Sequence, residues 1–161
     1  MLFVKLYMIE PEVAGEIGEN TVFDNYEELV VNGGTPVISH LHYVFMGWMG
    51  DDILETTPCF LVSERMKNAI EESDLKGYEF QNVEISVGED FEEMYPDIIL
   101  PCFYRLIPLG NVCVQDEKCS NPDGMDFCIT EKSYLVLSEK AMNVVKDFQI
   151  ENAEVTEICV E

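Results

Sequence analysis

The chain has 161 residues and a hydrophobic fraction of 47%, enough for one folded domain with a substantial core. Its 9 Lys and Arg residues stand against 32 Asp and Glu residues, which gives a formal net charge of −23. This composition excludes an intrinsically disordered chain, and it disfavours binding to nucleic acid or to an anionic membrane, because both ligands require Lys and Arg.

The start of the chain does not resemble a targeting segment. The first nine residues are apolar but carry Lys5, and they run into Glu10-Pro11-Glu12 without the small residues of a cleavage site. No apolar run reaches the roughly 18 residues that a membrane helix requires. We therefore expect a cytoplasmic protein, in which the six cysteines are free thiols: Cys59, Cys102, Cys113, Cys119, Cys128 and Cys159.

The N-terminal part of the chain predicts strands separated by loops. Residues 2–9 are almost entirely apolar and predict a strand that is covered on both faces. The next thirty or so residues are punctuated by Gly15, Gly18 and Gly33-Gly34, and residues 26–31 are interpreted as a short strand or a helical turn. Residues 36–48 are aromatic and β-favouring, which predicts further strands.

Two later segments resemble each other at a constant offset of 75 residues, 60–87 and 135–161. Each segment predicts a strand, a helix and a second strand. Ser63 and Ser138 follow apolar runs and are typical helix N-caps, because a serine hydroxyl can accept a hydrogen bond from a free backbone N–H of the first turn. Gly77 is expected to end the first helix in a left-handed conformation.

Residues 88–128 separate these two segments and predict a loop-rich insertion that begins with acidic residues. Each strand-helix-strand unit alone would bury too little apolar surface to be stable. We therefore predict a single domain over residues 1–161, with an α+β fold in which a mixed β-sheet carries two pseudo-repeated units and their helices pack on the sheet.

No catalytic or metal-binding motif of recognised spacing occurs. His40 and His42 are placed to share a strand face, where a metal pair is the less favoured interpretation and hydrogen-bonded histidines are the more favoured one. Cys113, Cys119 and Cys128, together with Asp116, Asp123 and Asp126, have neither zinc-site nor EF-hand spacing. We assign no catalytic residue, cofactor or metal, but a small metal- or thiol-dependent enzyme remains an alternative.

The acidic residues are unevenly distributed along the chain. No Lys or Arg lies between Lys5 and Arg65, an interval with 11 acidic residues, or between Lys76 and Arg105, an interval with 7. Carboxylates without cationic neighbours in sequence repel one another and attract basic proteins. The distribution therefore favours a cationic protein partner, with a generally acidic adaptor protein as a further alternative.

Several segments together resemble a known family, the uncharacterised α+β immunity proteins that accompany bacterial polymorphic toxins. The resemblance covers nearly the whole chain and is carried by Glu10-Pro11-Glu12-Val13-Ala14-Gly15, Leu41-His42-Tyr43, Gly47-Trp48-Met49-Gly50-Asp51-Asp52, Pro58-Cys59-Phe60-Leu61-Val62-Ser63-Glu64, Leu75-Lys76-Gly77-Tyr78-Glu79-Phe80, Leu137-Ser138-Glu139 and Asn152-Ala153-Glu154. It implies a protein that binds and neutralises a cognate toxin.

Charge and resemblance together predict a stoichiometric inhibitor that covers the basic substrate-binding face of a toxin such as a nuclease. The candidate contacts are the only tryptophan, since indole is a common interface anchor, and the acidic residues of two clusters. They are Trp48, Asp51, Asp52, Glu55, Glu89, Asp90, Glu92 and Glu93.

Overall fold

The computed structural model describes residues 5–46, 50–100, 102–120 and 122–160. The strands within these ranges form sheets of seven, four, three and two strands that combine parallel and antiparallel pairs. The helices there are α1 (Tyr26–Asn32), α2 (Glu64–Glu72), α3 (Glu89–Met94) and α4 (Glu139–Val145). The predicted α+β class with mixed sheets is confirmed. None of the helices described is long and apolar enough to cross a membrane.

The four-stranded sheet is antiparallel throughout, in the order β6 (Ile53–Thr56), β7 (Cys59–Ser63), β10 (Phe103–Pro108) and β8 (Tyr78–Asn82). The seven-stranded sheet has the order β11 (Gly110–Asn111), β14 (Phe127–Ile129), β15 (Leu135–Ser138), β1 (Lys5–Glu10), β16 (Glu154–Val160), β13 (Lys118–Ser120) and β12 (Cys113–Gln115). Strand β1 is therefore central, although it comes first in the chain.

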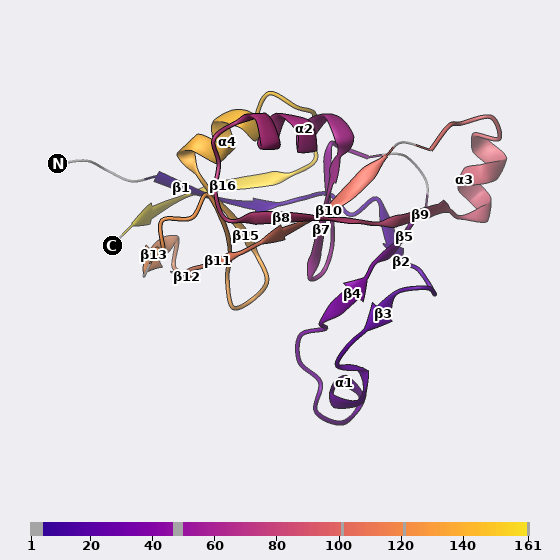
Figure 1. Ribbon diagram of the computed structural model, residues 1–161, viewed down its shortest axis with the longest axis horizontal. Coiled ribbons are helices and arrows are strands. Elements are labelled where there is room, and N and C mark those ends of the chain that lie inside the picture. The colour runs from indigo at the N-terminus through magenta and orange to yellow at the C-terminus, as the bar shows by residue number, and fades with distance from the viewer. Residues whose placement is uncertain (1–4, 47–49, 101, 121, 161) are drawn as a thin grey trace.

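Two smaller sheets lie toward the other end of the molecule (Figure 1). One has the order β2 (Gly15–Ile17), β5 (His42–Phe45) and β9 (Glu84–Val87), and the other pairs β3 (Val22–Phe23) with β4 (Ile38–His40). Strand β9 leads directly into α3, and β3 and β4 enclose α1. These two sheets therefore position both elements that stand out from the body of the molecule.

Helices α2 and α4 lie side by side over the sheets and begin as the sequence predicts (Figure 1). The Ser63 hydroxyl accepts a hydrogen bond from Met66 N at 3.3 Å, and the Ser138 hydroxyl accepts one from Ala141 N at 3.1 Å. The expected role of Gly77 is wrong, because α2 already ends at Glu72 and Ser73 caps it through the carbonyls of Ala69 and Ile70. Gly77 does adopt a positive φ of 88°, but it does so just before β8.

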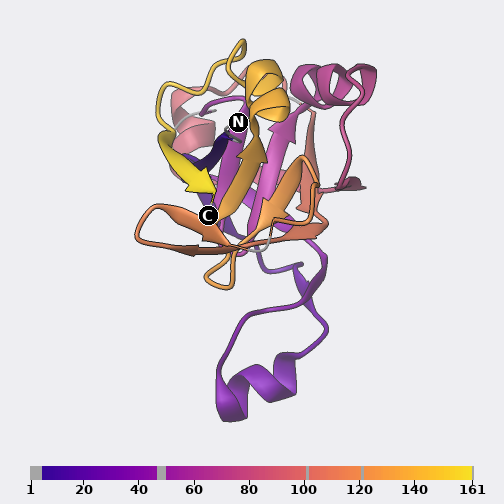
Figure 2. The same cartoon turned by 90° about the vertical axis from the view of Figure 1, so that its left-hand side faces the viewer.

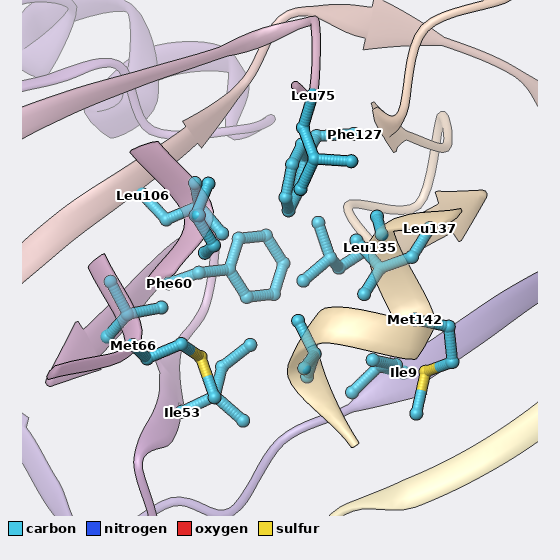
Figure 3. Close-up of a cluster of buried hydrophobic side chains, with 14 residues drawn as sticks. Ile9, Ile53, Phe60, Met66, Leu75, Leu106, Phe127, Leu135, Leu137 and Met142 are labelled. Atoms are coloured by element: carbon cyan, nitrogen blue, oxygen red, sulfur yellow. The ribbon is translucent and has the colours of Figure 1, made fainter. Parts of the chain in front are cut away.

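The main core lies beneath α2 and α4 and draws on both halves of the chain. Phe60 and Leu106 from the four-stranded sheet meet Phe127 and Leu135 from the seven-stranded sheet (Figure 3). Met66 and Ile70 of α2 and Ala141 and Val145 of α4 close this core from above. A separate cluster around Tyr43, Phe45 and Phe91 supports α3.

The segment predicted as a loop-rich insertion, residues 88–128, contains more regular structure than expected. It holds α3, β10, β11, β12, β13 and the start of β14. The two segments predicted as copies do each contain a strand, a helix and a strand, namely β7-α2-β8 and β15-α4-β16. Their origin as a repeat stays a prediction.

Candidate partner-binding site

Helix α3 presents acidic side chains to solvent and is anchored by one aromatic residue. Glu89, Asp90, Glu92 and Glu93 are all exposed, whereas Phe91 between them is fully buried. The Phe91 ring lies 6.4 Å from the Phe45 ring and 5.2 Å from the Tyr95 ring, measured between centroids. This packing fixes α3 on the body of the protein while the carboxylates remain accessible.

An exposed apolar segment follows α3 directly. Ile99 is 90% exposed, and Met94, Tyr95, Ile98 and Leu100 are also exposed. Ile98 and Ile99 line one side of an open groove of about 440 Å³, and Glu64 and Arg65 at the start of α2 line it as well. Exposed apolar patches beside charged residues are typical of protein interaction sites. We call α3, residues 94–100 and this groove the α3 face.

Asp51 and Asp52 also line the groove but are buried residues. Only 2% of Asp51 and 6% of Asp52 is exposed, so the expectation that they lie on the acidic surface is wrong. Asp51 Oδ2 accepts a hydrogen bond from Asn152 N at 2.8 Å. Asp52 Oδ1 accepts one from the Ser63 hydroxyl at 2.6 Å, and both its oxygens pair with the Arg65 guanidinium. Both aspartates are occupied by internal partners.

The structure does not place the two remaining candidate contact residues, Glu55 and Trp48, on the α3 face. Glu55 is half-buried on β6 and does not belong to the residues lining the groove. Trp48 lies outside the described residues. The structure thus places four of the predicted acidic residues together on α3, and separates them from Glu55.

The sequence suggested Asp126 only as a metal ligand. In the structure its carboxylate makes the same kinds of hydrogen bond as that of Asp52. Its Oδ1 accepts a hydrogen bond from the Ser138 hydroxyl at 2.6 Å, and its Oδ2 accepts one from Lys76 N at 2.7 Å, in the segment after α2. Asp52 Oδ2 accepts a hydrogen bond from Gln149 N at 2.9 Å, in the segment after α4. Each aspartate therefore joins the start of one helix to the segment that follows the other helix.

His40, His42 and Cys128 take part in local hydrogen bonds. His40 and His42 lie on different strands, and both approach Glu84, with N–O distances of 3.2 and 3.5 Å. Burial, followed by the nearby Asp123 carboxylate, raises the pKa of Cys128 to about 12, which keeps this thiol protonated. In the part of the chain that the structure describes, no three His, Cys, Asp or Glu side chains are grouped to hold one metal ion.

Asp52 and Glu55 have carboxyl pKa values that are shifted in opposite directions. Burial raises the pKa of Asp52, but hydrogen bonds from Arg65, Ser63 and Gln149 N outweigh burial, and that pKa lies below its ordinary value of 3.8. Burial raises the pKa of Glu55 above its ordinary value of 4.5; a hydrogen bond from Thr57 partly offsets this, and the charge of Glu10 adds to it. Ionised Asp52 therefore stabilises the folded state, and ionised Glu55 destabilises it.

These shifts predict opposite effects of two isosteric substitutions. Asp52→Asn should lower the free energy of unfolding at neutral pH, and the loss should shrink as pH falls through the folded-state pKa of Asp52. Glu55→Gln should raise it at neutral pH, and the gain should vanish once acid protonates Glu55 in the folded protein. Urea unfolding at a series of pH values measures both. A gain from Asp52→Asn at neutral pH would contradict the assignment.

The structure defines an acidic α+β protein in which acidic and apolar side chains are exposed together on the α3 face. The sequence identifies the family more closely: residues 5–107 match the model of the immunity protein family (Imm11). The matched segment covers more than half of the chain, and the chain belongs to this family, as the resemblance implied. No curated protein is similar enough to this chain to be matched with it. The matched segment includes both α1 and α3.

Proposed function

We propose that this chain binds a cognate toxin protein and neutralises it by occlusion, without catalytic turnover or a cofactor, in the cytoplasm of the cell that makes it. Membership of an immunity protein family supports the inhibitory role. The observation that carries the proposal is the α3 face, where four exposed carboxylates adjoin exposed Ile98 and Ile99 and an open groove. The toxin, on this proposal, is the secreted effector encoded beside this chain.

The proposed partner surface is basic, as in the substrate-binding face of a nuclease. Glu89, Asp90, Glu92 and Glu93 form no ion pair with another described residue, so they are free to pair with Lys or Arg of a partner. Carboxylates on one short helix can take the place of successive phosphates of a nucleic acid. The adjoining apolar residues would supply the desolvated centre of the interface, which charge alone does not provide.

We further propose that residues 1–161 act as one domain and that residues 60–87 and 135–161 descend from a repeat. The shared core supports the first statement, because Ile9, Phe60 and Leu135 belong to one buried cluster. The sheet orders support the second statement. Strand β10 separates β7 from β8, and β1 separates β15 from β16, each as an antiparallel neighbour of both.

Removing the charges of α3 tests the proposal. The variant E89Q/D90N/E92Q/E93Q should bind the purified neighbouring effector at least about tenfold more weakly at low salt, mainly through slower association. The difference should narrow in about 0.5 M salt, because screening weakens exposed charge pairs. Surface plasmon resonance measures both rates, and circular dichroism verifies that the variant stays folded.

The matched control removes four exposed carboxylates elsewhere, in E72Q/E79Q/D147N/E151Q. This control changes the net charge by the same amount, so equal weakening by both variants would show general attraction rather than docking on α3. Binding by the unmodified chain that does not depend on salt would reject the phosphate-like role of the carboxylates. No binding at all by the unmodified chain would reject the proposed function.

A further inference from the structure

We propose that residues 22–40, formed by β3, α1 and β4, are a second docking element for the cationic surface of the same toxin. We call this segment the arm; it extends away from the body of the protein in both views (Figures 1 and 2). The inference rests on the proposed function, since it assigns a further contact to the same partner. It concerns a different part of the surface from the α3 face (Figure 1).

The base of the arm is held firmly by the body of the protein. Ile38 is buried with Phe23 against the aromatic cluster, and Arg105 Nη1 donates a hydrogen bond to Ile38 O at 2.5 Å. Glu84 of β9 accepts a hydrogen bond from His40 Nε2 at 3.2 Å, at the end of the arm, and one at 2.7 Å from Asn20 Nδ2, two residues before the arm begins. The direction of the arm is therefore fixed by contacts at its base.

The loop of the arm is closed internally by one side chain. Asn25 Nδ2 donates to Thr35 O at 2.9 Å, and Asn25 Oδ1 accepts from Val37 N at 2.8 Å. A second bond joins Asp24 N to Val37 O at 2.7 Å. These bonds fix the two ends of the loop around α1 to each other. A binding element shaped in advance loses less conformational entropy when it docks.

The tip of the arm has no core of its own. Helix α1 contains no buried residue, and Tyr26 is 64%, Val30 68% and Val31 78% exposed. A seven-residue helix is marginal in water without tertiary packing. Three large apolar side chains kept in solvent on such a helix are typical of a surface that a partner covers.

Charge indicates which partner covers the arm. Asp24, Glu27 and Glu28 accompany the exposed apolar residues, and no Lys or Arg occurs anywhere between Lys5 and Arg65. A second copy of this chain, with its net charge of −23, would repel this surface, and so would an anionic membrane. The fitting occupant is an apolar patch surrounded by Lys and Arg, the kind of surface expected on a basic toxin.

Two substitutions on the arm test the inference against the purified neighbouring effector. V30S/V31S should raise the dissociation constant at least about tenfold, because two apolar anchors lose their burial in the complex. E27Q/E28Q should slow association several-fold at low salt and much less at high salt. Neither variant should change the urea midpoint of the free protein, since these side chains are exposed in it.

V155S on β16 and E151Q after α4 are the matched controls, because both residues are exposed and lie outside the arm and the α3 face. Normal affinity of both arm variants, with weakened binding of the α3 variant, would overturn the arm while leaving the proposed function intact. No binding by the unmodified chain would instead overturn the proposed function. Loss of a self-association equilibrium in V30S/V31S, with unchanged effector binding, would assign the arm to a second copy and reject the inference.

Discussion

Asp52→Ala is expected to lower the free energy of unfolding by about 3 kcal/mol, the range for breaking a buried, charge-assisted hydrogen-bond network. Asp52 is nearly fully buried and holds the Ser63 hydroxyl, the Arg65 guanidinium and Gln149 N at once. Removal of the carboxylate leaves the hydroxyl and the backbone N–H without their partner. Urea unfolding followed by circular dichroism measures the loss.

Asp126→Ala should cost less, about 2 kcal/mol, because its carboxylate joins Ser138 and Lys76 N without an arginine. Ser63→Ala and Ser138→Ala are the matched controls, and each should cost about 1 kcal/mol as the loss of a helix N-cap. Equal costs for the aspartate and the serine variants would show that the links to Gln149 and Lys76 contribute nothing. We expect these links to stabilise the contact between the two helices.

Gly15→Ala has the second large expected effect, a loss of about 3 kcal/mol from a steric clash that the structure cannot relax cheaply. A Cβ at Gly15 would lie 2.1 Å from the carbonyl oxygen of Val44, a backbone atom of the adjoining strand β5, and 3.0 Å from the Tyr43 ring. Tyr43 is itself buried, and its hydroxyl accepts a hydrogen bond from Ala14 N at 3.1 Å. Neither neighbour can move without disturbing the sheet.

Displacing β5 should also weaken toxin binding, because Phe45 of β5 supports Phe91 of α3, and Gly88 N donates a hydrogen bond to Phe45 O at 2.8 Å. Gly124→Ala is the control: its φ of 80° is unfavourable for alanine, but nothing lies within 4 Å of the added atom. It should cost about 1 kcal/mol and leave binding unchanged. Thermal or urea unfolding measures both losses of stability. If Gly15→Ala loses no more stability than Gly124→Ala, the steric explanation is wrong.

Features decided by local interactions could be predicted from the sequence. Ser63 and Ser138 cap their helices because a cap needs only a hydroxyl and the N–H groups of the next turn. Helix α2 ends earlier in the chain than the sequence predicts. Ser73 terminates it locally, because the Ser73 hydroxyl and backbone N–H both donate hydrogen bonds to Ala69 O. Gly77 takes the predicted conformation in a different turn.

Features decided by distant partners could not be predicted in this way. The strands within residues 88–128 include several of two or three residues, and β10 is recognisable as a sheet strand only through its pairing with β7 and β8. Charged residues are usually exposed, but Asp52 is buried and accepts a hydrogen bond from Gln149 N, 97 positions away in the chain. Conversely, only the fold shows that Val30 and Val31 are exposed.

The candidate site combines both kinds of feature. The acidic run of α3 is visible in the sequence, and its exposure follows from Phe91, the one apolar residue within it that the core can take up. The exposure of Ile98, Ile99 and Leu100 could not be foreseen, because an apolar run before a strand ordinarily predicts burial. The arm also escaped prediction, since residues 26–31 fit a short strand as well as a helical turn.

We propose that this protein neutralises a basic toxin by binding it through an acidic and apolar surface. Calorimetric titration of the purified chain with the neighbouring effector, at increasing salt, measures this binding. We expect a one-to-one complex whose affinity falls as salt rises and falls again when the α3 carboxylates are removed. Failure of the unmodified chain to form a complex at low salt would contradict the proposal.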